Sequence, residues 1–406
     1  MDYFEQALST LDHLPGTHDT REQAIDLRLA LRSALVPSGD SGRTLAYLRE
    51  AETLAEGLAD PRRLGQVCRF LSAHFRAMGV YDQAITAAQR TLVLATASGD
   101  AFLQALANFH LGAAYEFQGD YRRAIDCFRQ TVASLEGALH HERFGGVFLP
   151  AVNARAWLAR CHAELGMFSA GRAFGEEALQ IAEAVAHPAS PMVASYRVGR
   201  LALRQGDLYR ALPRLERAMG ICQDAALTIY FPWVAEALGT AYMMGGRGAD
   251  AVPLLTQALE QTTAPEMIGF QALCGLSLGE AQLLAGRLED AHALAQDALA
   301  HAREYQERSN QAYALRLLGD IAARREPPDT AQAAAHYQQA LALAEELGMR
   351  PLQAHCHRGL GTLYLKTGQQ EQAQAELSTA IALYRAMDMT FWLPETEAAL
   401  AQVESQ

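Results

Sequence analysis

The chain has 406 residues, of which 50% are hydrophobic and 20% are charged, so it can build a sizeable core and is not a disordered chain. Its formal net charge of −12 argues against a nucleic-acid-binding protein, which needs a basic face to displace counterions from phosphate. It contains no apolar stretch long enough to span a membrane and no signal peptide, and its six cysteines are scattered singly, as in a reducing compartment. These features predict a cytoplasmic protein.

The first predicted element is a helix over residues 1–14, MDYFEQALSTLDHL. It has the pattern of the second helix of a hairpin, but no first helix precedes it. Because the ends of repeat arrays normally carry an atypical cap, this start predicts a truncated preceding repeat within a longer protein.

Residues 15–390 are predicted to contain nine copies of one motif. The copy at 110–128, HLGAAYEFQGDYRRAIDCF, shows it best, with Leu111-Gly112, a glycine turn at Gly119 and Tyr121 after the turn. The interval between copies is 40 residues, except for 47 before Leu158 and 42 before Leu360. The anchor residues are Leu31, Leu71, Leu111, Leu158, Val198, Leu238, Leu278, Leu318 and Leu360.

Each copy is predicted to form two helices that break at the glycine. Punctuation between copies agrees with this, because Asp60-Pro61 supplies an N-cap and a first-turn proline, and Ser98-Gly99-Asp100 supplies a stop and the next cap. A glycine or alanine beside the anchor allows close approach of the helices. No alternating strand pattern is present, so the fold class is predicted to be all-α, with a capping helix at 391–406.

The extra residues before Leu158 fall between helices, in an insertion near 137–150. The glycines of Phe144-Gly145-Gly146 allow a bend there, whereas Val147, Phe148 and Leu149 are predicted to be buried against neighbouring helices. Insertions at such positions leave a stack of hairpins intact.

The motif resembles the tetratricopeptide repeat (TPR), in the longer subtype with a period of 40 residues rather than about 34. The resemblance covers nearly the whole chain. Arg32 stands where the family has a small residue, and Glu326 stands where it has the turn glycine. The resemblance implies an α-solenoid, a right-handed superhelix of nine hairpins with a terminal helix at each end, whose first helices line the concave face.

Three short motifs invite a catalytic or metal-binding interpretation that their setting opposes. Cys356 lies four residues before Leu360, where other copies carry small apolar residues, and His355 and His357 diverge from it by about 100° per residue on a helix. GLSLG at 275–279 resembles a nucleophile elbow, but falls inside a predicted helix. HHERF at 140–144 lacks the second histidine of a zinc helix. No phosphate-binding loop is present, so no catalytic residue, metal or cofactor is predicted.

By the resemblance, groove positions lie five and two residues before each anchor and two, five and six after it. An arginine cluster on adjacent copies and a group of aromatic and methionine side chains stand out there, and they predict a protein or peptide partner with acidic and apolar character. In the alternative, the arginines pair with Glu164 or Glu236. The candidates are Asn153, Arg160, Tyr196, Arg200, Arg204, Trp233, Glu236, Met243, Tyr313 and Arg316, with Met244, Arg69, Phe109, His355 and Arg358 in supporting positions.

The stretches at 345–364 and 384–400 resemble the C-terminal ends of large bacterial signalling proteins that carry a class III nucleotide cyclase domain and a signal-transduction ATPase module. This resemblance implies a non-catalytic scaffold that senses a partner for domains attached in cis. The alternative is a free-standing adaptor or peptide receptor.

Overall fold

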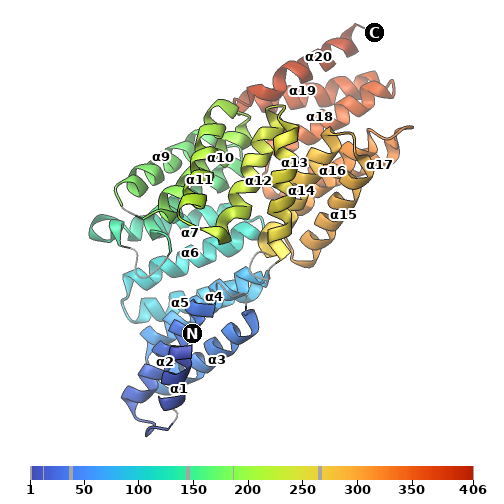
Figure 1. Cartoon of the computed structure of the whole chain (residues 1–406). Helices are drawn as coiled ribbons and strands as arrows, with labels where there is room; N and C mark the ends of the chain where they lie inside the picture. The colour runs from blue at the N-terminus through green and yellow to red at the C-terminus, as the bar shows by residue number, and fades with distance from the viewer. Residues whose placement is uncertain are drawn as a thin grey trace.

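The computed structural model describes residues 2–11, 13–35, 40–142, 147–185, 187–263 and 268–405. All regular elements in these ranges are helical, which confirms the all-α solenoid (Figure 1). The hand of the superhelix stays a prediction. The helices are α1 (Asp2–Leu11), α2 (His18–Leu35), α3 (Ser41–Leu58), α4 (Pro61–Ala77), α5 (Tyr81–Ala97), α6 (Ala101–Phe117), α7 (Tyr121–Ser134), η2 (Gly137–His141), α8 (Pro150–Glu164), α9 (Phe168–Glu183), α10 (Ala189–Gln205), α11 (Leu208–Asp224), η3 (Thr228–Tyr230), α12 (Phe231–Met244), α13 (Gly248–Glu260), η4 (Gln261–Thr263), α14 (Ile268–Leu284), α15 (Leu288–Glu304), α16 (Arg308–Ala322), α17 (Thr330–Leu347), α18 (Arg350–Lys366), α19 (Gln370–Ala386), η6 (Thr390–Trp392) and α20 (Leu393–Glu404).

Within the described residues, α2 to α19 form nine antiparallel hairpins, each of which packs on the next, while α1 and α20 extend the stack at its two ends. The nine anchor residues lie on the even-numbered helices from α2 to α18, and none is more than 7% exposed. The predicted caps are present. Asp60 accepts hydrogen bonds from the backbone N–H groups of Arg62 and Arg63, and Asp100 accepts one from Leu103.

The small residue beside the anchor allows the two helices of a hairpin to touch. A Cβ added to Gly199 would lie 2.6 Å from Leu215 Cγ on the partner helix, and one added to Gly239 would lie 2.6 Å from Leu255 Cγ. Real Cβ atoms do not approach so closely, so a larger residue would push the helices apart. Within this geometry, Cys356 is fully buried, like its equivalents from the second copy onward.

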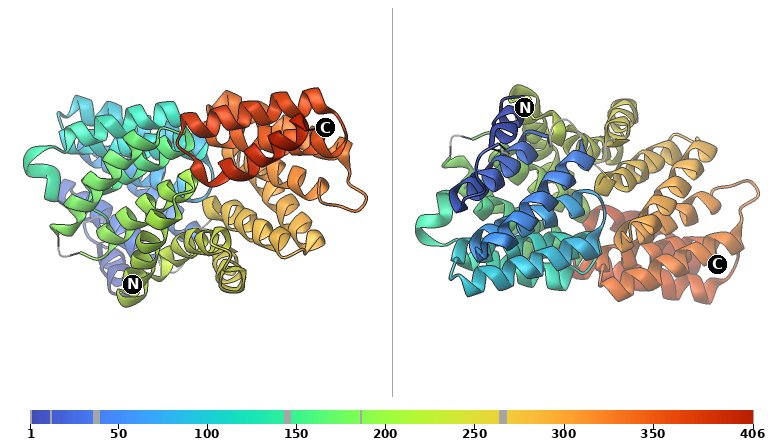
Figure 2. Two further views of the ribbon diagram at one scale, coloured as in Figure 1. Left: turned by 90° about the horizontal axis from the view of Figure 1, so that it is seen from above. Right: turned by 90° about the horizontal axis from the view of Figure 1, so that it is seen from below.

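The superhelix closes on itself, so that helices far apart in sequence lie side by side. Figure 2 shows the C-terminal helices beside those of the first half of the chain, and α8 contacts α18. Two buried hydroxyls also join α5 and α7 to the start of α16: Tyr81 Oη donates to Glu307 Oε1 at 3.0 Å, and Tyr121 Oη donates to Ser309 Oγ at 2.8 Å.

Turn glycines between paired helices make this closure possible. Gly79 and Gly166 have φ of +70° and +73°, a conformation that L side chains rarely adopt, and they end first helices as the sequence predicts. They also leave no room for a side chain, because a Cβ would lie 2.3 Å from the Tyr305 ring in one case and 2.3 Å from Met387 Sδ in the other. Each of these glycines is therefore required twice, once for the turn and once for the closure contact.

The insertion before α8 is only partly as predicted. Leu149 is fully buried and Phe148 packs on Tyr230 with ring centroids 5.1 Å apart. The prediction for Val147 is wrong, because this residue is 50% exposed. The predicted bend at residues 144–146 lies outside the described residues.

Candidate functional site

A cavity of about 430 Å³ opens on the side of the first helices α10, α12, α14, α16 and α18. The C-terminal segment of η6 and α20 completes its wall. Residues from these elements line it: Arg200, Leu203, Arg204, Glu236, Thr240, Met243, Met244, Leu273, Leu276, Ser277, Glu280, Leu283, Leu284, Tyr313, Arg316, Asp320, Arg324, His355, Arg358, Phe391, Trp392 and Glu395.

Six of the ten sequence candidates lie on this wall, and so do three of the supporting ones. The six are Arg200, Arg204, Glu236, Met243, Tyr313 and Arg316. The supporting residues are Met244, His355 and Arg358.

Four candidates lie elsewhere. Asn153 and Arg160 belong to α8, outside the cavity wall. The expectation that Tyr196 is open to a ligand is wrong, because it is fully buried. Trp233 is partly buried and stacks on Phe270 with ring centroids 4.5 Å apart. These two aromatic residues thus belong to the core between hairpins, where the twist of the stack turns their helix faces toward neighbouring copies.

The arginines of the predicted cluster pair with carboxylates. Arg160 Nε lies 2.5 Å from Glu116 Oε1, Arg204 Nη2 lies 2.9 Å from Glu164 Oε1, and Arg200 forms an ion pair with Glu236. The charges of these three arginines are therefore neutralised within the chain. The alternative stated from sequence describes two of the three pairs.

The pairing follows the repeat. Arg200, two residues after its anchor, meets Glu236, two residues before the next anchor, and Glu280 meets Arg316 in the same relation with the charges reversed. Consecutive copies thus present complementary charges at the same two register positions. A search for opposite charges 36 residues apart would have found both pairs in the sequence.

Burial and pairing act in opposite directions on these groups. Burial alone would lower the pKa of Arg200, and the adjacent Glu236 carboxylate raises it above its ordinary value. Burial disfavours the charged form of Glu164, but Arg204 and the hydroxyl of Tyr313, which donates to it at 2.6 Å, hold its pKa below the ordinary value. Removing one member of such a buried pair typically costs about 3–5 kcal/mol. A charge reversal at Arg200 would therefore perturb the fold before it reported on binding.

Some cavity residues were missed by the sequence reading although they fill predicted positions. Leu273 and Leu276 lie five and two residues before Leu278, and Glu280 lies two after it. Phe391 and Trp392 have no repeat register at all. They reach the cavity because the C-terminal segment docks near the turn at Gly206, where a Cβ would lie 2.6 Å from Phe391 Cβ.

The sequence motifs that suggested other chemistry have structural roles. Ser277 lies within α14 and donates a 2.7 Å hydrogen bond to Glu236 Oε1, so it is not in the strand-turn-helix setting of a nucleophile elbow. His355 Nδ1 lies 2.7 Å from Tyr384 Oη, whereas His357 Nδ1 lies 2.6 Å from Glu376 Oε2. The two histidines thus point to different partners, and burial raises the pKa of the Cys356 thiol to about 12.

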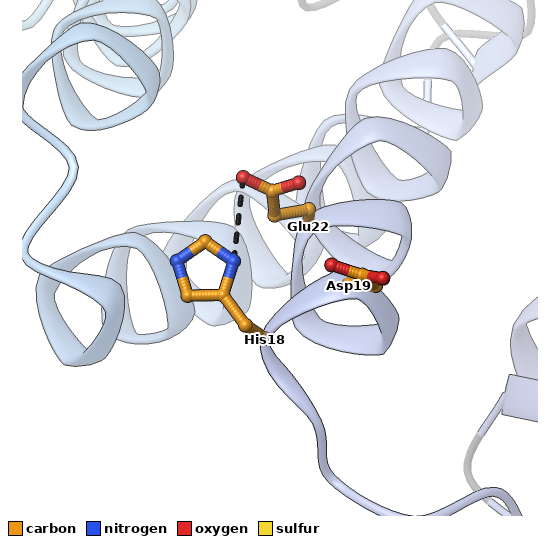
Figure 3. Close-up of side chains that lie close together, drawn as sticks. All are labelled: His18, Asp19 and Glu22. Carbon is orange, nitrogen blue, oxygen red and sulfur yellow. Dashed lines mark ion pairs between the residues drawn. The ribbon is translucent and has the colours of Figure 1, made fainter.

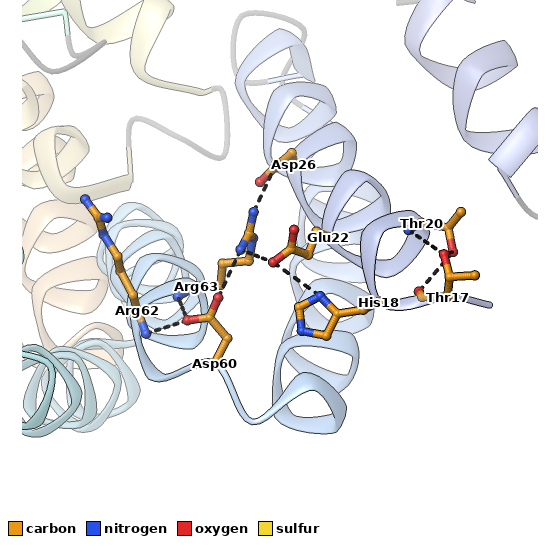
Figure 4. A network of polar contacts seen from close by, with 8 residues as sticks. All are labelled: Thr17, His18, Thr20, Glu22, Asp26, Asp60, Arg62 and Arg63. Atoms are coloured by element: carbon orange, nitrogen blue, oxygen red, sulfur yellow. Dashed lines mark hydrogen bonds and ion pairs between the residues drawn. The ribbon is translucent and has the colours of Figure 1, made fainter.

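One group of potential metal ligands in the described part of the chain, His18, Asp19 and Glu22, comes together near the start of α2 (Figure 3). His18 and Asp19 are exposed. Glu22 is already engaged by Arg63 at 2.5 Å, which also pairs with Asp60 at 3.0 Å (Figure 4). The group is part of an ion-pair network that joins α2 to α4, and nothing further marks it as a metal site.

No helix in the described ranges combines the length and the hydrophobicity that crossing a bilayer requires. No curated protein sequence matches the chain. Residues 66–137 match the sequence model of the tetratricopeptide repeat.

Among solved structures, the chain is similar to the Rap conjugation gene regulator of the plasmid pLS20 in complex with the Phr* peptide, with a TM-score of 0.56 and 14% identity over 90% of this chain and 97% of that one. It is also similar to a Rap protein complexed with Competence and Sporulation Factor, with a TM-score of 0.55 and 15% identity over 74% and 85% of the two chains. A signal transduction ATPase with a tetratricopeptide repeat sensor from Pyrococcus horikoshii aligns over 94% of this chain and 55% of that one, with 14% identity and a TM-score of 0.49.

At these identities the solved structures establish the fold alone. The family match at 66–137 covers most of the second hairpin and all of the third, and the same anchor and helix pairing recur from α2 to α19. Residues 66–137 thus match the tetratricopeptide repeat, and the helical-hairpin architecture that they adopt recurs from α2 to α19.

Proposed function

We propose that the chain is a non-catalytic scaffold that binds a peptide or an extended protein segment in the cavity between α10 and α20. The observation that carries the proposal is the cavity itself. Its volume of about 430 Å³ lies within the range of about 300–1,000 Å³ typical of ligand pockets, and its wall combines apolar and charged side chains from five consecutive first helices. The Rap proteins with similar folds were solved with the Phr* peptide and with Competence and Sporulation Factor, which supports this choice.

The cavity wall suggests what such a segment would offer. Met243, Met244 and Leu273 are only partly buried, and they provide an adaptable apolar surface. Most cavity arginines are neutralised by carboxylates, but Arg324 is exposed and forms no ion pair within the described residues; its guanidinium donates only a 3.4 Å hydrogen bond to the Leu283 carbonyl. A ligand with one apolar anchor and one carboxylate would complement these groups.

The test uses peptides selected from a random phage-displayed library on the immobilised full chain, with affinity measured by fluorescence polarisation. Met243→Glu should weaken binding at least tenfold, because it places a charge on the apolar wall. Val93→Glu, at a site 68% exposed on α5, is the matched control and should change nothing. Arg324→Gln should weaken only those peptides that carry a carboxylate.

If every selected peptide binds Met243→Glu as tightly as wild type, while circular dichroism shows both folded, the cavity is not the site. Equal loss in Val93→Glu would likewise overturn the assignment.

The setting of this scaffold is a separate matter. The resemblance of residues 345–364 and 384–400 to signalling proteins favours a sensor region with cyclase or ATPase domains in cis, and a free-standing adaptor is the second setting. Sequencing the gene on both sides of the coding region distinguishes them, because an adjoining in-frame P-loop supports the first and flanking stop codons support the second.

A further inference from the structure

Three arginines gather on the first helices at the N-terminal end of the array. Arg69 and Arg76 lie two turns apart on the same face of α4, and Arg32 lies on the neighbouring first helix α2. All three are partly buried. Unlike Arg200, Arg204 and Arg316 of the cavity, none of them forms an ion pair with a carboxylate in the described part of the chain.

Phe70 holds two of these guanidinium groups in place. The Cζ atom of Arg69 lies 3.9 Å from the centroid of the Phe70 ring, and that of Arg32 lies 4.7 Å from it, both within cation–π distance. Arg69 also donates from Nε to Gln66 Oε1 at 3.0 Å. The ring therefore orders the two side chains and leaves their remaining donors available.

Several buried polar atoms in this cluster have no hydrogen-bond partner within the described structure. The Nε atoms of Arg32 and Arg76 are buried and unpaired, and so is Nδ1 of His110 on α6. His110 is 8% exposed, and its pKa lies well below the ordinary value because of burial and the charges of Arg69 and Arg76. A buried donor left unpaired costs about 1–3 kcal/mol.

The cluster is electrostatically strained as well. Burial lowers the pKa of Arg32 to about 10, and the charge of Arg76 contributes in the same direction. Burial and the charge of Arg32 lower the pKa of Arg69 to about 10. Glu116 is the one carboxylate that acts on Arg76, and it already pairs with Arg160 at 2.5 Å. Arg32 and Arg69 thus carry like charges with no carboxylate partner in the described part of the chain, and Arg76 shares Glu116 with Arg160.

We propose that Arg32, Arg69 and Arg76 form a binding site for an oxyanion, a ligand group with two or more phosphate or carboxylate oxygens. Guanidinium groups recognise both groups through paired hydrogen bonds, and the free donors supply them. An anion would also relieve the repulsion among the arginines. The site lies on α2, α4 and α6 and not on the cavity wall, so it does not depend on the proposed peptide site.

The experiment is isothermal titration calorimetry on the full chain at low salt, with inorganic pyrophosphate and citrate as probes. Saturable binding of at least one probe is expected, and the preferred probe distinguishes a phosphate from a carboxylate ligand. Arg69→Gln and Arg76→Gln should each weaken binding at least tenfold. Arg217→Gln removes an equally charged but exposed side chain, paired with Glu183 on another surface, and should leave the affinity unchanged.

Thermal unfolding separates this role from a merely structural one. The preferred probe should raise the melting temperature of the wild type but not that of Arg69→Gln or Arg76→Gln. Without the probe, Arg69→Gln should melt no lower than wild type, because it removes a repulsive charge. The proposal is overturned if neither probe binds saturably, if Arg217→Gln weakens binding as much as the cluster variants do, or if Arg69→Gln lowers stability without weakening binding. Arg69→Lys, which keeps the charge, replaces any variant that fails to fold.

Discussion

The Glu307 carboxyl should make the stability of this protein depend on pH, because it lies buried at the contact that closes the superhelix. It is 1% exposed and receives hydrogen bonds from Tyr81 Oη at 3.0 Å and from Asn310 Nδ2 at 2.7 Å. Burial raises its pKa to about 7 from an ordinary value of 4.5, although the two donors lower it. The perturbation to make is Glu307→Gln, which mimics the protonated carboxyl.

The direction in which stability changes with pH follows from the number of protons that the folded and unfolded states bind. Between pH 4.5 and 7 the folded state holds a proton on Glu307 that the unfolded state has released, so stability falls as pH rises through this window. The difference between the two pKa values is roughly 2.5 units, which corresponds to about 3 kcal/mol at about 1.4 kcal/mol per unit. We therefore expect Glu307→Gln to be similar to wild type at pH 4 and more stable by about 3 kcal/mol at pH 8.

The assay is urea unfolding followed by circular dichroism, with the free energy of unfolding of each variant compared at pH 4, 6, 7 and 8. Tyr81→Phe keeps the ring that stacks on Phe117, at 5.5 Å between centroids, and removes the hydroxyl donor. The pKa of Glu307 in the folded state should then rise further, so the loss of stability should still begin near pH 4.5 but continue to higher pH than in wild type. If the difference between wild type and Glu307→Gln is the same at every pH, the carboxyl does not titrate in this range and the reasoning fails.

Two further substitution pairs test the packing. Gly199→Ala should destabilise the protein by about 1–3 kcal/mol, because the new Cβ would lie 2.6 Å from Leu215. Gly220→Ala, which has open space around it on α11, should stabilise the protein by up to about 1 kcal/mol. Equal effects of the two substitutions in urea unfolding would show that the hairpin is not so closely packed. Leu149→Ala should cost about 2–5 kcal/mol, and Val147→Ala should cost less than about 0.5 kcal/mol, as read from thermal melts. Similar losses at both positions would mean that the end of the insertion packs differently.

The hairpins themselves could be predicted from the sequence, because the contacts that define them are local. Each hairpin needs an anchor such as Leu238, a small neighbour such as Gly239 and a cap such as Asp100, and all of these recur at a fixed spacing. In a solenoid each repeat packs mainly on its neighbours, so a periodic sequence determines the helix order and the stacking. The burial of Cys356 followed from the same register.

The candidate site could be predicted only in part. The register placed Arg200, Met243 and Arg316 on the cavity wall, because the same face of each first helix turns inward. It could not show that Tyr196 is covered by the next hairpin. The sequence offered Glu164 and Glu236 as alternative partners of the arginines, but it did not indicate that Arg160 pairs with Glu116.

Only the tertiary structure decided how the array closes. Each hairpin is rotated slightly against the previous one, and the sum of these rotations over nine copies brings Tyr81 to Glu307 and the turn of Gly166 to Met387. The same closure carries Trp392 into the cavity. A repeat pattern records what each copy shares with the next, and the small angle that separates them is set by side-chain packing along the whole stack.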